Sequence, residues 1–123
     1  MLGQKKILIV DDQPKICEFL TDSLRQHGYD TAVAMDGQKG LEEMERFKPD
    51  LVLLDIMMPV MDGWEMLVAL RAKEKKVKTP VIMLTAKSNT EALIKSQQYQ
   101  VTDYFIKPIN MPELLAFIKR YIK

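Results

Sequence analysis

The chain has 123 residues, of which 47% are hydrophobic and 28% are charged, so its length and composition suit one globular domain with its own core. A formal net charge of +1 provides no global field for nucleic acid or an acidic membrane surface, and no apolar run is long enough to span a bilayer. One cysteine excludes an internal disulfide, and charged residues interrupt the N-terminal segment before a signal sequence forms, so we expect a cytoplasmic protein.

Strand-like and helix-like segments alternate five times along the chain. In chain order we expect a strand at 7–10, a helix at 14–27, a weaker strand at 29–35, a helix at 37–47, a strand at 51–54, a helix at 64–73, a strand at 81–84, a helix at 88–98, a strand at 104–106 and a helix at 111–122. Short continuous apolar runs are typical of strands buried on both faces of a parallel sheet. Strict alternation favours right-handed crossovers with helices on both faces. We therefore predict a five-stranded parallel doubly wound sheet of order 2-1-3-4-5, the flavodoxin-like (βα)5 architecture.

The predicted helices carry local start signals and apolar stripes. Pro14 suits a first turn, and Asp36 and Asn110 suit the N-cap positions of the second and last helices. The stripe of the first helix is Cys17, Leu20 and Leu24. Gly40 inside the second helix should cost on the order of 1 kcal/mol relative to alanine.

Four of the predicted strands end beside a residue with useful chemistry. Asp11 and Asp12 follow the first strand, Asp55 the third, Thr85 the fourth and Lys107 the fifth. The carboxyl ends of parallel strands meet at one edge, which is where open α/β sheets bind ligands. Three neighbouring carboxylates repel one another, and a hard divalent cation such as Mg²⁺ relieves that repulsion. The set therefore predicts a Mg²⁺-assisted phosphoryl-transfer site.

Each of these residues also has a simpler structural interpretation. Asp11 and Asp12 could cap the following helix, and Asp12 could do part of that work, although capping needs only one carboxylate. Thr85 alone could be a turn hydroxyl, and Lys107 a solvated lysine before a Lys-Pro bond that is free to be cis. Together, an ammonium and a hydroxyl are the donors that a phosphoryl group on Asp55 requires.

Five motifs in order resemble the receiver domain of bacterial two-component response regulators: Asp11-Asp12, residues 51–55, residues 58–63, Thr85-Ala86 and Lys107-Pro108. The resemblance covers essentially the whole chain and implies one receiver domain over residues 1–123. It implies that Asp55 accepts a phosphoryl group from the phosphohistidine of a sensor histidine kinase or a histidine phosphotransfer protein. It also implies a Mg²⁺ site, where Mn²⁺ can substitute, formed by Asp12, Asp55 and the backbone carbonyl of Met57, with Asp11 as a ligand through water.

The same resemblance assigns roles to the residues around the phosphoacceptor. Lys107 would pair with the phosphoryl group, Thr85 would hydrogen-bond to it after transfer, and Tyr104 would swing inward behind Thr85. Met57 and Lys87 would flank the approach of water and set the lifetime of the phosphorylated form. Methionine has no good donor or acceptor to orient that water, so we expect slow self-dephosphorylation.

Ile16 and Phe19 flank the apolar stripe of the first helix, beside the acidic site. They are candidates either for the core or, with Pro108, for a surface that docks the histidine-bearing partner, and the sequence leaves both open. We expect no direct contact with nucleic acid or membrane. We also expect a monomer before phosphorylation, because the last two helices lack a dense charge pattern.

Three other functions compete with a phosphorylation-activated switch. A phosphohydrolase with an aspartyl-phosphate intermediate commonly has a second aspartate where this chain has Met57. A flavin or nucleotide binder would need a phosphate loop rich in small residues after the first strand, where this chain is acidic. A module that only binds partners would not need the acidic set. We therefore predict a regulator that assists its own phosphotransfer and dephosphorylation and is not an enzyme for external substrates; its kinase, stimulus, effector and full length stay open.

Overall fold

The computed structural model describes residues 3–86 and 101–123, so Lys87 and the helix predicted at 88–98 lie outside the described residues. Five strands form one parallel sheet: β1 (Lys6–Val10), β2 (Asp30–Ala34), β3 (Leu51–Asp55), β4 (Val81–Thr85) and β5 (Asp103–Ile106). Their order is β2-β1-β3-β4-β5, which confirms the predicted fold class and strand order.

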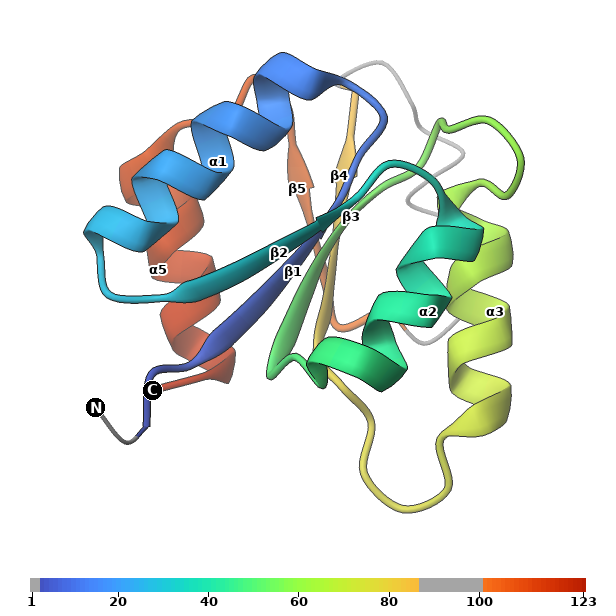
Figure 1. Cartoon of the computed structure of the whole chain (residues 1–123). Coiled ribbons are helices and arrows are strands. Elements are labelled where there is room, and N and C mark those ends of the chain that lie inside the picture. Colours follow the sequence, from blue (N-terminus) through green and yellow to red (C-terminus); the bar gives the residue numbers. More distant parts are fainter. Residues whose placement is uncertain (1–2, 87–100) are drawn as a thin grey trace.

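Helices cover both faces of the sheet (Figure 1). The described helices are α1 (Pro14–Gln26), α2 (Gly37–Phe47), α3 (Gly63–Lys73) and α5 (Met111–Tyr121). α1 and α5 lie on one face, and α2 and α3 lie on the other. None of the described helices combines the length and apolar character that a membrane crossing requires.

Successive residues of the central strands point into two separate cores. Leu8, Val52 and Met83 face α2 and α3, whereas their neighbours Ile9 and Leu53 face α1 and α5. All five side chains are 0% exposed. Because both faces of these strands are buried, their sequences are continuously apolar and do not alternate between apolar and polar residues. Each fully buried aliphatic side chain contributes about 1.5–3 kcal/mol of transfer free energy.

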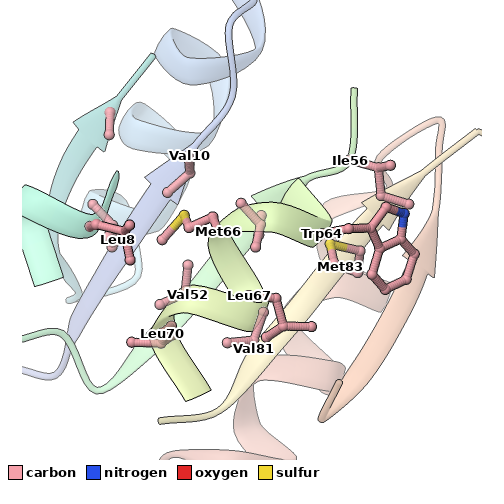
Figure 2. Packing of buried hydrophobic residues seen from close by; sticks show 13 residues of the cluster. Leu8, Val10, Val52, Ile56, Trp64, Met66, Leu67, Leu70, Val81 and Met83 are labelled. Carbon is pink, nitrogen blue, oxygen red and sulfur yellow. The ribbon is translucent and has the colours of Figure 1, made fainter. Parts of the chain in front are cut away.

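The core beneath α3 is filled by large side chains of that helix (Figure 2). Met66 lies over β1, near Val10, while Trp64 packs at the other end beside Ile56 and Met83. On the opposite face the predicted stripe of Cys17, Leu20 and Leu24 is buried, as are Leu114, Ile118 and Ile122 from the C-terminal segment.

Helix caps agree with the sequence at two positions and differ at one. The Asp36 carboxylate accepts a hydrogen bond from the Lys39 N–H at 2.8 Å, and the Asn110 side chain accepts one from the Glu113 N–H at 3.1 Å. Capping of α1 by Asp12 is wrong, because the N-cap residue is Gln13 and its side chain makes no capping bond. The Asp11 carboxylate accepts the Gln13 N–H instead, which leaves Asp12 to line the edge of the sheet.

Candidate functional site

The predicted site residues meet at the carboxyl edge of the sheet because of strand register. Val10 pairs with Leu54, so the residues that follow them, Asp11 and Asp55, are neighbours. Thr85 pairs with Ile106, which brings Lys107 to the same edge. An open depression there is lined by Asp12, Gln13, Asp55, Ile56, Met57, Leu84, Thr85, Ala86 and Lys107.

Asp11, Asp12 and Asp55 form an acidic cluster in which one ligand atom from each residue lies within 4.8 Å of the others. Asp11 is 0% exposed and Asp55 is 7% exposed, while Asp12 is the most accessible of the three. This is the only such group of three or more potential metal ligands among residues 3–86 and 101–123.

Lys107 provides the positive charge of the site. Its Nζ donates a hydrogen bond to Oδ1 of Asp55 at 3.2 Å and lies 3.6 Å from Oδ2 of Asp11. Its backbone N–H donates to the Thr85 carbonyl at 2.7 Å, and the Lys107–Pro108 peptide bond is cis. The end of β5 therefore aims the ammonium at both buried carboxylates.

The Asp11 carboxylate is only half satisfied. Its Oδ1 accepts the Gln13 N–H at 2.9 Å, but its buried Oδ2 has no hydrogen-bond partner in the described part of the chain. The Lys107 ammonium, at 3.6 Å, is too distant for a hydrogen bond. A buried carboxylate oxygen without a donor is costly, and a cation in the depression would satisfy it.

The electrostatics of Asp55 also favour a cation. Burial raises the pKa of Asp55, and the charges of Asp11 and Asp12 raise it further, while Lys107 opposes them. Among the described residues, with the carboxylates ionised and Lys107 protonated, three negative charges face one positive charge, which leaves a formal charge of −2. This donor set of carboxylate oxygens and its charge fit a hard divalent ion such as Mg²⁺.

Two residues that support the site were not singled out for this role from the sequence. The Cys17 thiol donates to the Asp11 carbonyl oxygen at 3.2 Å, across the turn from β1 into α1. Gly63 donates its N–H to the Ile56 carbonyl at 2.8 Å, and a Cβ atom there would lie 2.3 Å from the Asp55 carbonyl oxygen. A glycine at the start of a helix was the only sequence signal for this close approach.

The switch candidates Thr85 and Tyr104 lie on adjacent strands. Thr85 is 3% exposed, and its hydroxyl donates a long hydrogen bond of 3.4 Å to the Ala86 carbonyl. Tyr104 is half-buried and packs against the core on the α2 and α3 side. Within residues 3–86 and 101–123, therefore, no strong hydrogen bond holds the Thr85 hydroxyl at the depression.

The remaining predicted residues differ in exposure. Met57 is 75% exposed at the rim of the depression. Phe19 is 44% exposed and Pro108 is also exposed, whereas Ile16 is half-buried and packs against the core beneath α1. The choice between core and surface thus resolves towards surface for Phe19 and largely towards core for Ile16.

Comparisons with known proteins agree on one family. The model of the response regulator receiver domain matches residues 7–119. The DNA-binding response regulator MtrA of Mycolicibacterium smegmatis is 39% identical over 120 residues, which cover 98% of this chain and 51% of that protein. The chain therefore spans about half the length of this curated relative.

Solved structures share the whole fold. The chemotaxis protein CheY4 of Vibrio cholerae matches with a TM-score of 0.90 and 30% identity, covering 98% of this chain and 100% of that one. The receiver domain of the sensor histidine kinase PA1611 of Pseudomonas aeruginosa matches with a TM-score of 0.88 and 31% identity, covering 98% of each chain. That structure has a magnesium ion coordinated in its active-site cleft.

Proposed function

Because the chain belongs to the response regulator receiver family, we propose that Asp55 is the phosphoacceptor through which it works as a phosphorylation-activated switch in two-component signalling. The observation that carries this assignment is the contact between the buried Asp55 carboxylate and Lys107 at 3.2 Å, in a depression open to a phosphodonor. Asp11 and Asp12 are less suited, because Asp11 is fully buried and the Lys107 ammonium pairs with Asp55 and Asp11 rather than with Asp12.

The transfer step follows from these positions. A carboxylate oxygen of Asp55 attacks the phosphorus of a partner's phosphohistidine, a P–O bond forms, and the P–N bond breaks with its electron pair going to the imidazole. Lys107 is placed to pair with a phosphoryl oxygen, and the Thr85 hydroxyl to donate to another. Adjacent strand ends hold the backbones of both residues at the depression, so transfer requires only that their side chains turn towards the phosphoryl group.

Receiver domains bind Mg²⁺ at their acidic pocket, and the unsatisfied Oδ2 of Asp11 fits such a site here. We assign the ion to Asp12, Asp55 and the Met57 carbonyl, with Asp11 as a ligand through water and with Mn²⁺ as a substitute. Bound there, the ion would neutralise charge on the phosphoryl oxygens.

The test is intact-protein mass spectrometry after incubation with acetyl phosphate and Mg²⁺. Wild-type protein should gain the mass of one phosphoryl group, and Asp55→Ala should gain none. Asp22→Ala, at an exposed position of α1, is the matched control and should label like wild type. Full labelling of Asp55→Ala at another residue would remove Asp55 as the acceptor.

The lifetime of the phosphorylated form is a further part of the proposal. Met57 lines the depression with Asp55 and has no good group to orient an attacking water, so hydrolysis should be slow. Met57→Asn, alone and with Lys87→Glu, should release phosphate faster under saturating Mg²⁺. Unchanged or slower release in both variants would assign the lifetime to other residues.

The phosphodonor of this family is a histidine kinase. We propose that it or a histidine phosphotransfer protein docks on Phe19, Pro108 and the accessible part of the half-buried Ile16. The exposure of Phe19 and Pro108 beside the site supports this surface. We also propose a monomeric unphosphorylated state, from the sparse charge pattern of the last two predicted helices. The absence of direct nucleic-acid binding by this domain and a cytoplasmic location are proposals that rest on composition.

A further inference from the structure

Met57 is the only methionine in the described part of the chain that is mostly exposed to solvent. Its side chain is 75% exposed, whereas Met66 and Met83 are 0% exposed. The other described methionines are half-buried: Met35, Met44, Met58, Met61 and Met111. Because methionine oxidation follows exposure, a peroxide would reach Met57 before the other described methionines.

The other sulfur group near the site is protected from the same oxidants. Cys17 is 5% exposed, and its thiol is held against the Asp11 carbonyl. Burial therefore keeps the Cys17 sulfur out of reach of a peroxide in solution.

We propose that Met57 is a site of reversible oxidation by hydroperoxides, and that its sulfoxide shortens the lifetime of the phosphorylated site. The sulfur lone pair attacks one peroxide oxygen, the S–O bond forms and the O–O bond breaks. With hydrogen peroxide the second oxygen leaves as water, so sulfur loses two electrons and the peroxide gains them. The second half of this proposal rests on the function proposed for Asp55.

The effect on lifetime follows from what lines the depression. Met57 and Asp55 both line it, together with residues that include Gln13, Thr85 and Ala86. A thioether is a weak acceptor, but a sulfoxide oxygen accepts strong hydrogen bonds. It would hold a water beside the phosphoryl group on Asp55, which restores the entropic advantage of a positioned nucleophile.

The oxidation site is tested on wild-type protein, Met57→Leu and the matched control Met58→Leu, each treated with limiting hydrogen peroxide. Peptide mass spectrometry should place the first added oxygen on Met57 in wild type and in Met58→Leu. First oxidation at another methionine, or at Cys17, would overturn the site.

The lifetime is tested by phosphorylating each protein, adding peroxide and following phosphate release under saturating Mg²⁺. Release should become several-fold faster in wild type and Met58→Leu and should not respond in Met57→Leu. Methionine sulfoxide reductase should restore the slow rate. Equal or slower release from the oxidised wild type would overturn the effect on lifetime.

Failure of the underlying function has a separate signature. If wild-type protein takes up no phosphoryl group before oxidation, the assignment of Asp55 fails and the lifetime effect falls with it. Peptide mapping still decides whether Met57 is the oxidation site, because it needs no phosphorylation.

Discussion

Asp12 contributes charge to the acidic cluster without a compensating partner among the described residues. Lys107 lies near Asp55 and Asp11, and no ion pair with Asp12 is formed within residues 3–86 and 101–123. Repulsion among the three carboxylates therefore opposes folding whenever no cation is bound. The acidic cluster therefore lowers the folding stability of the metal-free protein while it provides a cation-binding site, as is common for functional sites.

Asp12→Ala should therefore raise the melting temperature of the metal-free protein by a few degrees. The same change should weaken the stabilisation by Mg²⁺, because a ligand that binds only the folded state stabilises it more when it binds more tightly. Thermal unfolding with EDTA and across a Mg²⁺ titration measures both effects. Asp22→Ala controls for loss of a surface charge, and an Asp12→Ala response to Mg²⁺ equal to wild type would exclude Asp12 as a ligand.

At Gly40, inside α2, the packing against α3 outweighs the low helix propensity of glycine. Replacing a helical glycine by alanine usually gains on the order of 1 kcal/mol. Here the added Cβ would lie 2.6 Å from the Met66 sulfur and 3.3 Å from Val10, and Met66 is fully buried. The contact fixes how closely α2 approaches α3.

We expect Gly40→Ala to destabilise the fold by about 1 kcal/mol, because overpacking costs about 1–3 kcal/mol and exceeds the gain in propensity. Urea denaturation measures the difference. Gln38→Ala, at an exposed position of the same helix, should be neutral or stabilising. A stabilised Gly40→Ala variant would show that the Met66 side chain moves aside at little cost.

Hydrogen bonds among Arg71, Glu74 and Thr79 stabilise the connection from α3 to β4. Arg71 donates to the Glu74 carboxylate at 2.7 Å and to the Thr79 carbonyl at 2.8 Å, and the Thr79 N–H donates back to Glu74 at 2.7 Å. Burial alone would raise the pKa of Glu74, but the hydrogen bonds from Thr79 and the charge of Arg71 outweigh it and lower the pKa. The Arg71 and Glu74 side chains are 8% and 11% exposed, so solvent screens this pair little.

Glu74→Gln should cost about 2 kcal/mol of unfolding free energy at neutral pH, since hydrogen bonds to a charged group are lost. The folded-state pKa lies below the ordinary value of 4.5, so the carboxylate's contribution is complete above pH 4.5. It disappears as pH falls through the folded-state pKa, and the two proteins should converge there. Denaturation across this pH range measures the effect, and Glu43→Gln, in an exposed pair with Arg46, should cost little at any pH.

The sheet connects the acidic site at its carboxyl edge to the core that α2 and α3 cover. Thr85 and Tyr104 lie on the neighbouring strands β4 and β5, with Thr85 at the depression and Tyr104 packed on the α2 and α3 side. Every residue of β4 is buried, so a change at the phosphoryl group is expected to travel by side-chain rearrangement.

Phosphorylation should turn the Thr85 hydroxyl to the phosphoryl group and let the Tyr104 ring fill the vacated space. Thr85→Ala should accept a phosphoryl group but lose the amide shift changes in β5 that accompany phosphorylation of wild type. Heteronuclear NMR before and after acetyl phosphate measures them. Identical β5 shift changes in the variant and in wild type would separate Thr85 from the switch.

The parallel sheet, its strand order and the residues that meet at its carboxyl edge were all predictable from the sequence. Those residues are Asp11, Asp12, Asp55, Thr85 and Lys107. Strands such as Leu51–Asp55 are buried on both faces, so their apolar runs are a local signal of a global position. Because side chains that follow parallel strands share one edge, Asp11, Asp55 and Lys107 could be placed together before any contact was known.

Three features of the site could be seen only in the tertiary structure. They are the unsatisfied Oδ2 of Asp11, the N-cap of α1 at Gln13 and the close approach of Gly63 to the Asp55 backbone. The tertiary structure also decided that Phe19 and Met57 face solvent while Ile16 packs inward. These features depend on distances between atoms that are remote along the chain, and periodicity records only which face of an element a residue occupies. Packing of those faces against one another sets how exposed each side chain is, which buried polar atoms find hydrogen-bond partners and how much room surrounds a glycine. The hydrophobic pattern of the sequence therefore does not predict these properties.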